Sequence, residues 1–369
     1  MHYSAPCKLF ISGEWSILEL GNQGMIAAIN KRVHSIIETN DKGIVISIED
    51  FNINNLKCRF DGRNLIFYED VEPIKDKISF IKKSIEVALR FLKDNKIKLK
   101  PFKICTWGEK TNIKINGKLK KVGFGGSAAA TVAVIGSVLA FHGYEAKREE
   151  IYKLATIAHY FAQGKVGSGF DVAASTYGGL FVYKRFDPEW LTKKIKSKES
   201  IKKIVKEKWP GFYFERLEIP RDLILLIGWT RESASTSEMI KQMEEFKRNN
   251  PNVYNKLIKK IANIATNAID AFKKGDRKEF LELLKENEKG LADLGKAAGI
   301  NIETPELKKL CELANMQGAA GKLSGAGGGD CGIAICFNKN IKEKVENAWK
   351  KGGIYIIDAD IDNIGLESK

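Results

Sequence analysis

The 369-residue sequence predicts an α+β protein, organised as two domains or as one large one. Three observations lead to this expectation. Short runs of β-branched residues near the N-terminus are typical of a strand-rich sheet. The second half alternates helical and strand patterns in the order β-α-α-α-β-β. Glycine clusters at 123–127, 164–169 and 325–329 mark turns where the backbone can approach a ligand closely.

The composition is that of an ordinary globular enzyme, with 44% hydrophobic and 29% charged residues. No run of about 18 apolar residues occurs, and the start carries no basic segment followed by an apolar one, so we expect a cytoplasmic protein without membrane contact. The six cysteines form no CxxC pair and lie in apolar surroundings. This pattern indicates free buried thiols and argues against a zinc site.

The net charge of +15 is compatible with a nucleic-acid partner, an anionic small substrate or a lysine-rich solvated surface. Its densest block, Leu191 to Lys208, holds eight lysines and two glutamates around an apolar stripe and predicts an amphipathic surface helix. Aromatic residues are not interleaved with arginine, and no zinc-finger or RNA-recognition signature occurs. We therefore expect no nucleic-acid partner.

The first domain is expected to begin as a sheet. Two apolar strands within the first thirty residues are joined by Ser12-Gly13-Glu14, and strands follow at 33–38 and 43–48. From Ile78 to Leu92 the apolar residues follow the spacing of one helix face, and 101–106 is expected to return as a strand. The polar segment that follows is interpreted as a loop.

The stretch from Lys121 to Phe141 carries the main functional signal of the first half. Four small residues precede an Ala-rich run that predicts a buried helix: Gly123, Gly125, Gly126 and Ser127. The first N–H groups of such a helix point at one place, backed by the positive end of the helix dipole. A phosphate site is therefore expected, where Ser127 can offer its hydroxyl to a phosphate or to its Mg²⁺. The alternative is a glycine turn that only starts a core helix.

A second glycine-rich turn follows a helix predicted over 149–163. His159 lies near the apolar stripe of that helix and is interpreted as structural. The turn at 164–169 leads into Asp171, an isolated acidic residue among small neutral ones. As a helix cap Asp171 would be unremarkable. If it faces the first glycine turn, it becomes a candidate for chemistry.

The second half begins beyond the lysine-rich block. Residues 223–228 are typical of a strand covered on both faces, and a Ser/Thr-rich loop with Ser235 and Thr236 then leads into a helix start. Three helices are expected over 252–274, 276–298 and 304–316. The third glycine cluster precedes a buried strand, and 353–358 supplies the last one.

Three motifs in this order resemble those of the GHMP kinases, named for galactokinase, homoserine kinase, mevalonate kinase and phosphomevalonate kinase. The matches are Pro6, Lys8, Gly13 and Glu14 for the first motif, Gly123 to Ala128 for the phosphate loop, and KLSGAGGGD at Lys322 to Asp330 for the third. The resemblance spans residues 5 to about 337. It implies a two-domain fold with the active site in the cleft between an N-terminal domain (1–185) and a C-terminal domain (221–369), joined by a lysine-rich connector (186–220).

Within the family, Trp15 and the sequence GWTRESAST at 228–236 resemble the branch that phosphorylates phosphomevalonate. The chain departs from the family pattern at Cys7, which replaces a common glycine, and at Gly126, which replaces a serine. Tyr160-Phe161 occupies the neighbourhood where mevalonate kinases carry an acidic Mg²⁺ ligand. Mevalonate phosphorylation and ATP-dependent decarboxylation are alternatives within the superfamily. A non-enzymatic sensor and a nucleic-acid-binding protein are alternatives of other classes.

The resemblance implies ATP and Mg²⁺ as cofactors and phosphomevalonate as acceptor. Lys8 and Asp171 would be catalytic, and Ser127 would meet the metal. The nucleotide phosphates would be held by Gly123, Gly125, Gly126, Ser127 and Ala128. The acceptor would be held by Lys8, Lys165, Ser168, Gly169, Asp171, Ser235, Thr236, Gly325, Ala326 and Gly327. A phosphate acceptor is largely dianionic at pH 7, so no base is needed, and Asp171 is expected to hold Lys8 in place.

Overall fold

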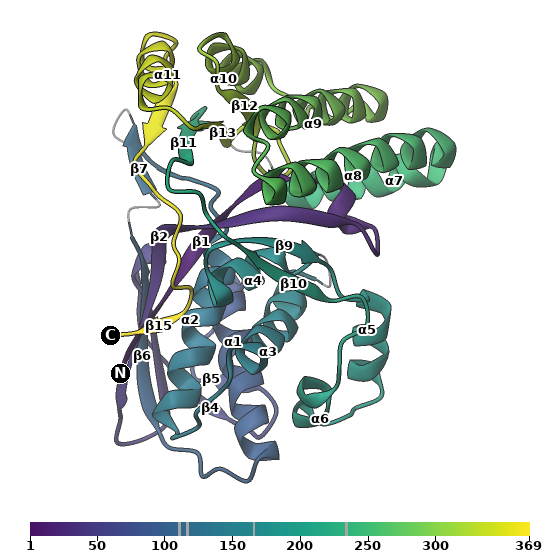
Figure 1. The fold of residues 1–369 in the computed structure, drawn as a ribbon. Helices are drawn as coiled ribbons and strands as arrows, with labels where there is room; N and C mark the ends of the chain where they lie inside the picture. Colours follow the sequence, from purple (N-terminus) through teal and green to yellow (C-terminus); the bar gives the residue numbers. More distant parts are fainter. Residues whose placement is uncertain (110–111, 116–117, 165–166, 233–234) are drawn as a thin grey trace.

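A computed structural model of the chain places its strands in two main sheets, with helices packed against each (Figure 1). The structure describes residues 1–109, 112–115, 118–164, 167–232 and 235–369. Within these residues the larger sheet has nine strands, seven of them in the order β10-β9-β2-β6-β3-β4-β5. The other two are β1, which pairs with β2, and β15, which pairs with β1. The smaller sheet has the order β12-β13-β11-β14.

The first layer combines the larger sheet with helices on one side of it, some packed on its strands and others packed on those helices or beside them (Figure 1). Its strands are β1 (His2–Ser12), β2 (Gln23–Thr39), β3 (Ile44–Ile48), β4 (Ile53–Phe60), β5 (Leu65–Phe67), β6 (Phe102–Gly108), β9 (Leu180–Lys184), β10 (Tyr213–Leu217) and β15 (Glu367–Ser368). Its helices are α1 (Lys75–Asp94), α2 (Gly126–Phe141), α3 (Arg148–Ala162), α4 (Phe170–Tyr177), α5 (Pro188–Lys196) and α6 (Ile201–Lys206). A separate hairpin pairs β7 (Asn112–Ile115) with β8 (Lys118–Lys121).

The second layer combines the smaller sheet with the remaining helices. Its strands are β11 (Ile224–Trp229), β12 (Ala320–Leu323), β13 (Cys331–Cys336) and β14 (Tyr355–Ile357). Its helices are α7 (Thr236–Asn249), α8 (Pro251–Lys274), α9 (Arg277–Ala298), α10 (Pro305–Met316) and α11 (Lys339–Lys351). Short 3₁₀ turns occur at Ser16–Leu18, Glu49–Phe51 and Glu72–Ile74.

Strand β2 lies where the two layers meet. Its residues 24–29 are all buried, because α2 and α4 pack against the strand from one layer and α8 from the other (Figure 1). A strand covered on both faces is expected to be continuously apolar rather than alternating. The adjacent strand β1 carries Lys8 along this same junction, so residues of β1 are placed between the layers.

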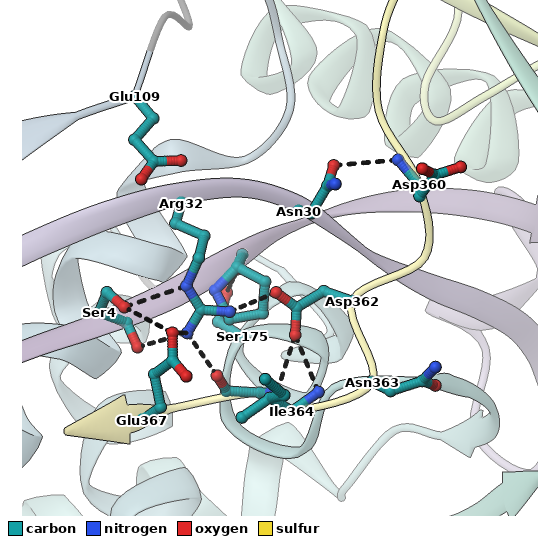
Figure 2. A network of polar contacts seen from close by, with 12 residues as sticks. Ser4, Asn30, Arg32, Glu109, Ser175, Asp360, Asp362, Asn363, Ile364 and Glu367 are labelled. Carbon is teal, nitrogen blue, oxygen red and sulfur yellow. Dashed lines mark hydrogen bonds and ion pairs between the residues drawn. The ribbon is translucent and has the colours of Figure 1, made fainter. Parts of the chain in front are cut away.

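The C-terminal segment returns from the second layer to the first and ends beside the N-terminus (Figure 1). We call residues 359–369, together with their contacts to Ser4 and Arg32, the C-terminal clasp. Figure 2 shows the Arg32 guanidinium at its centre, where it donates to the Ser4 carbonyl at 2.8 Å, to the Gly365 carbonyl at 2.6 Å and to the Asp362 carboxylate. Asp362 also accepts the N–H groups of Ile364 and Gly365. The buried charges of the clasp are therefore paired and hydrogen-bonded.

Most helices predicted from hydrophobic periodicity are confirmed. The ranges 78–92, 149–163, 252–274, 276–298 and 304–316 correspond to α1, α3, α8, α9 and α10. The hairpin β7–β8 lies in the segment interpreted as a loop, and β10 and α11 were not predicted. Five of the six cysteines are buried, as expected, and Cys105 is partly exposed. Within the described ranges, no helix combines the length and apolarity that a membrane span requires.

The single helix predicted over Leu191–Lys208 is wrong. The chain forms α5 and α6 instead, because Lys198 adopts a left-handed φ of +60° and the Ser200 side chain caps a new helix by accepting the N–H of Lys203. Helix α6 packs on α1 and α3, and β10 then pairs with β9 in the larger sheet. The segment 186–220 is thus folded onto the first layer, while the domain bounds at 185 and 220 stay predictions.

Candidate active site

A cavity of about 440 Å³ lies where β1, the start of α2, the start of α4 and the loop after β12 meet. Each of the three glycine clusters contributes to its wall. The lining residues are Lys8, Phe10, Glu14, Trp15, Ile17, Leu18, Val122, Gly123, Gly125, Gly126, Ser127, Gln163, Gly167, Ser168, Phe170, Asp171, Thr236, Ile240, Gly325, Ala326 and Asp330. Elements distant in sequence thus form one concave site with a few convergent polar groups, which is the usual form of a small-molecule site.

The N-terminus of α2 opens toward this cavity without a side-chain cap. Gly125 takes the N-cap position with φ of +77°, and no described side chain accepts the first N–H groups. Helices α5, α7, α9, α10 and α11, in contrast, each begin with a side chain that accepts a backbone N–H. Uncapped N–H groups and the positive end of the helix dipole make the start of α2 a suitable phosphate site.

Lys8 joins the phosphate loop to the third glycine cluster. Its backbone N–H donates to the carbonyl of Phe124 at 3.0 Å. The Lys8 side chain runs beside Gly125: a Cβ added at Gly125 would lie 3.1 Å from the Cε of Lys8. The Nζ of Lys8 is near Gly325, where an added Cβ would lie 3.9 Å from it. The Nζ also lies 5.7 Å from the centre of the Phe170 ring. Glycine at 125 is therefore needed both for the left-handed turn and for the close approach of Lys8.

Asp171 lies in the first turn of α4 and faces His159. One carboxylate oxygen accepts the N–H of Val172 at 2.9 Å, and the other lies 3.7 Å from His159 Nε2. The same nitrogen lies 3.2 Å from the hydroxyl of Ser127. Among the ion pairs of the described residues, none joins Asp171 to Lys8. Sequence reasoning treated His159 as structural, and its position on an apolar helix stripe gave no signal of this contact between two site residues.

Asp330 closes the other side of the phosphate loop. Its Oδ1 accepts the N–H of Gly123 at 3.0 Å, and a Cβ at Gly123 would lie 1.6 Å from its Oδ2. Burial raises the pKa of Asp330, whereas the Gly123 N–H and the charge of Lys8 act in the opposite direction. Sequence reasoning matched Asp330 only as the end of the third motif. The signal that could have marked it is an acidic residue placed directly after a glycine cluster.

The first and third motifs are joined behind the cavity by buried polar contacts. Glu14 forms an ion pair with Lys322, and both side chains are almost completely buried. Trp15, with a φ of +61°, donates its indole N–H to the carbonyl of Ala326 at 3.1 Å. Burial raises the pKa of Glu288 to about 7, although this carboxylate accepts the N–H of Leu323 at 2.7 Å. These contacts fix the third glycine cluster relative to β1.

Several predicted site residues do not line the cavity. Ser235 is exposed and caps α7, and Ala128 is buried within α2. Gly169 packs against the side chains of Phe186 and Tyr183, and Gly327 packs against the backbone of Ile302. Ser168 and Thr236 do line the cavity, and the buried hydroxyl of Ser168 has no partner among the described residues. Lys165 lies outside the described residues.

Two family models match one stretch in each half of the chain, and known proteins resemble it over nearly its whole length. The model of the GHMP kinases N terminal domain matches residues 80–179, and that of the GHMP kinases C terminal matches 268–354. A phosphomevalonate kinase of Saccharolobus solfataricus is 30% identical over 99% of this chain and 98% of the relative. One from a Streptomyces species is 29% identical over 95% of this chain and 94% of the relative. The structure of Streptococcus pneumoniae phosphomevalonate kinase in complex with phosphomevalonate and AMPPNP has a TM-score of 0.82 and 25% identity, covering 98% and 99% of the two chains.

Proposed function

The chain belongs to the GHMP kinase family, and on that premise we propose that it transfers the γ-phosphoryl group of ATP to the phosphate of (R)-5-phosphomevalonate. The products are 5-diphosphomevalonate and ADP. The observation that carries the proposal is the convergence of Lys8, the uncapped start of α2 and the third glycine cluster on one cavity. The choice of acceptor is supported by relatives that align over almost the whole chain.

Phosphoryl transfer needs positioning and charge neutralisation more than covalent help. The N–H groups at the start of α2 would bind the β- and γ-phosphates, with Gly123, Gly125 and Gly126 allowing close approach. Lys8 lies between the first and third glycine clusters and would meet charge on the transferring group and on the acceptor. The hydroxyl of Ser168, which has no partner among the described residues, would serve the anionic acceptor.

The acceptor phosphate removes the need for a catalytic base, because it is largely dianionic at pH 7. Asp171 is then a positioning residue. Its carboxylate lies 3.7 Å from Nε2 of His159, and the same nitrogen contacts the Ser127 hydroxyl at 3.2 Å. The charge of Asp171 would therefore act on the Ser127 contact through space, without a hydrogen-bonded relay across the imidazole. Orienting Lys8, as the sequence suggested, would require a movement of at least one of the two side chains.

The cavity also fits a Mg²⁺ ion that accompanies ATP. It offers the hydroxyl of Ser127 and the carboxylates of Asp171 and Asp330, and Mg²⁺ prefers oxygen ligands. When bound with the nucleotide, such an ion neutralises charge on the phosphates. We propose the hydroxyl of Ser127 as a ligand of this Mg²⁺ ion.

A coupled ADP-release assay tests the proposal. Mevalonate, phosphomevalonate and diphosphomevalonate are supplied in parallel with ATP and Mg²⁺, and release of CO₂ is followed as well. We expect turnover with phosphomevalonate alone and no CO₂. Turnover with mevalonate would replace the proposal with mevalonate kinase activity, and CO₂ release would replace it with decarboxylation.

A further inference from the structure

The carboxylate of Asp330 occupies an unusual place for a negative charge. It accepts the N–H of Gly123 in the loop that is proposed to bind phosphates. Its backbone is held there, since its N–H donates to the Glu232 carbonyl at 2.7 Å and its carbonyl accepts the N–H and hydroxyl of Thr230. The φ of Asp330 is +65°, in the left-handed region, which aspartate and asparagine adopt more readily than other residues with a side chain.

A carboxylate beside a phosphate chain repels it unless a cation lies between them. Of the other two carboxylates described in the cavity wall, Glu14 pairs with the ammonium of Lys322, and Asp171 lies 3.7 Å from Nε2 of His159. Asp330 forms no ion pair within the described part of the chain. Lys8 affects its charge from a distance but does not come within ion-pair range. Among the described residues, Asp330 therefore has hydrogen-bond donors but no cation within ion-pair range, and it lies beside the proposed phosphate site.

We propose that Asp330 is the carboxylate that holds the divalent cation carried by the nucleotide phosphates. The proposal rests on the proposed function, because it needs a nucleotide at the start of α2. Mg²⁺ is typically bound by one or two carboxylates together with substrate phosphates and water. No group of three or more His, Cys, Asp or Glu side chains among the described residues could hold a metal by itself. The cation would thus be shared between Asp330 and the nucleotide phosphates.

Calorimetric titration of ADP, with excess EDTA and again with saturating Mg²⁺, tests the role of Asp330. For Asp330→Asn we expect ADP without metal to bind as tightly as to the wild type or up to roughly tenfold more tightly, because a repulsive charge is removed. We expect Mg²⁺-ADP to bind roughly tenfold more weakly, because a metal ligand is lost. Electron paramagnetic resonance of Mn²⁺ with ADP reports the same loss directly as weaker Mn²⁺ binding.

Two further variants keep the outcome decisive. Asp330→Gly also tolerates the left-handed backbone, so it provides a second test if the asparagine variant folds poorly. Asp222→Asn, at a partly exposed carboxylate that pairs with Arg277 outside the cavity, is the control and should change neither titration. The proposal would be overturned if Asp330→Asn weakened ADP binding equally with and without metal, or changed neither. It would also be overturned if Asp171→Asn, and not Asp330→Asn, weakened Mg²⁺-ADP binding while leaving metal-free ADP binding unchanged or tighter. If the wild type binds neither ADP form, the proposed function fails first.

Discussion

The C-terminal clasp and the cavity use charged residues in opposite ways. In the clasp, Arg32 and Asp362 are buried, paired and supplied with additional hydrogen bonds (Figure 2). In the cavity, Lys8 and Asp330 have no ion-pair partner within the described chain, and the start of α2 has no side-chain cap. Buried polar groups that are fully satisfied hold a fold together, whereas those left unsatisfied need a functional explanation. The contrast separates stabilising charges from functional ones.

The largest expected effect comes from breaking the clasp. Arg32→Met leaves Asp362 buried without its cation, so we expect the free energy of unfolding to fall by about 3 to 5 kcal/mol. Urea unfolding measures this change. Lys260→Met, which breaks an exposed pair with Asp293, is the control and should cost at most about 1 kcal/mol. Equal losses in the two variants would contradict the assignment of the clasp to stability.

Removing Lys8, which has no ion-pair partner among the described residues, should act on catalysis instead. Lys8→Met is expected to lower kcat by about two orders of magnitude or more, the effect of losing one preorganised contact of roughly 3 to 4 kcal/mol. Its unfolding free energy should stay within about 0.5 kcal/mol of the wild type. Steady-state kinetics and urea unfolding on the same preparations separate the two effects. A loss of unfolding free energy as large as that of Arg32→Met would mean that Lys8, like the charges of the clasp, mainly stabilises the fold.

Glu288 is an intermediate case, buried like the clasp but incompletely paired like the cavity. One oxygen accepts the Leu323 N–H, and the other has no partner among the described residues. Burial raises the pKa of Glu288 from its ordinary value of 4.5 to about 7, so between these two pH values the folded state keeps a proton that the unfolded state releases. The wild type therefore loses stability as the pH rises from 4.5 to about 7.

Replacing Glu288 by glutamine removes this titration. The stability of Glu288→Gln relative to the wild type should therefore increase over that pH window by up to about 3 kcal/mol and level off above it. Urea unfolding at pH 5 and pH 8 measures the difference. Parallel stability curves for the two proteins would show that Glu288 does not titrate in this range.

The smallest effect is expected at Asp171. Asp171→Asn should lower kcat roughly tenfold, the size of one lost contact of about 1.5 kcal/mol. If Asp171 is no base, the remaining rate should follow ionisation of the acceptor near pH ~6 and stay flat to about pH 9. A pH–rate profile measures this. A rate that climbs about tenfold per pH unit would mean that a proton is being removed, as for an alcohol acceptor.

Features that depend on residues close together in the chain could be predicted from the sequence. Helix periodicity located α8, α9 and α10, and the glycine clusters indicated where the backbone would bend toward a ligand. The contacts that distinguish the two regions join residues hundreds of positions apart, such as Gly123 with Asp330 and Arg32 with Asp362. Such pairs leave no periodic signal in one sequence. The break between α5 and α6 did have a local signal, because a serine before an apolar residue is a typical helix cap.

The most direct test of the proposed function follows the phosphorus–oxygen–phosphorus linkage that forms when the γ-phosphoryl group is transferred to the acceptor phosphate. Phosphorus NMR of one reaction that contains enzyme, ATP, Mg²⁺, mevalonate and phosphomevalonate observes both acceptors together. We expect the phosphomonoester signal of phosphomevalonate to be replaced by two coupled diphosphate signals as ADP appears, with no new monoester. A new monoester signal formed from mevalonate, with phosphomevalonate unconsumed, would contradict the proposed transfer to a phosphate.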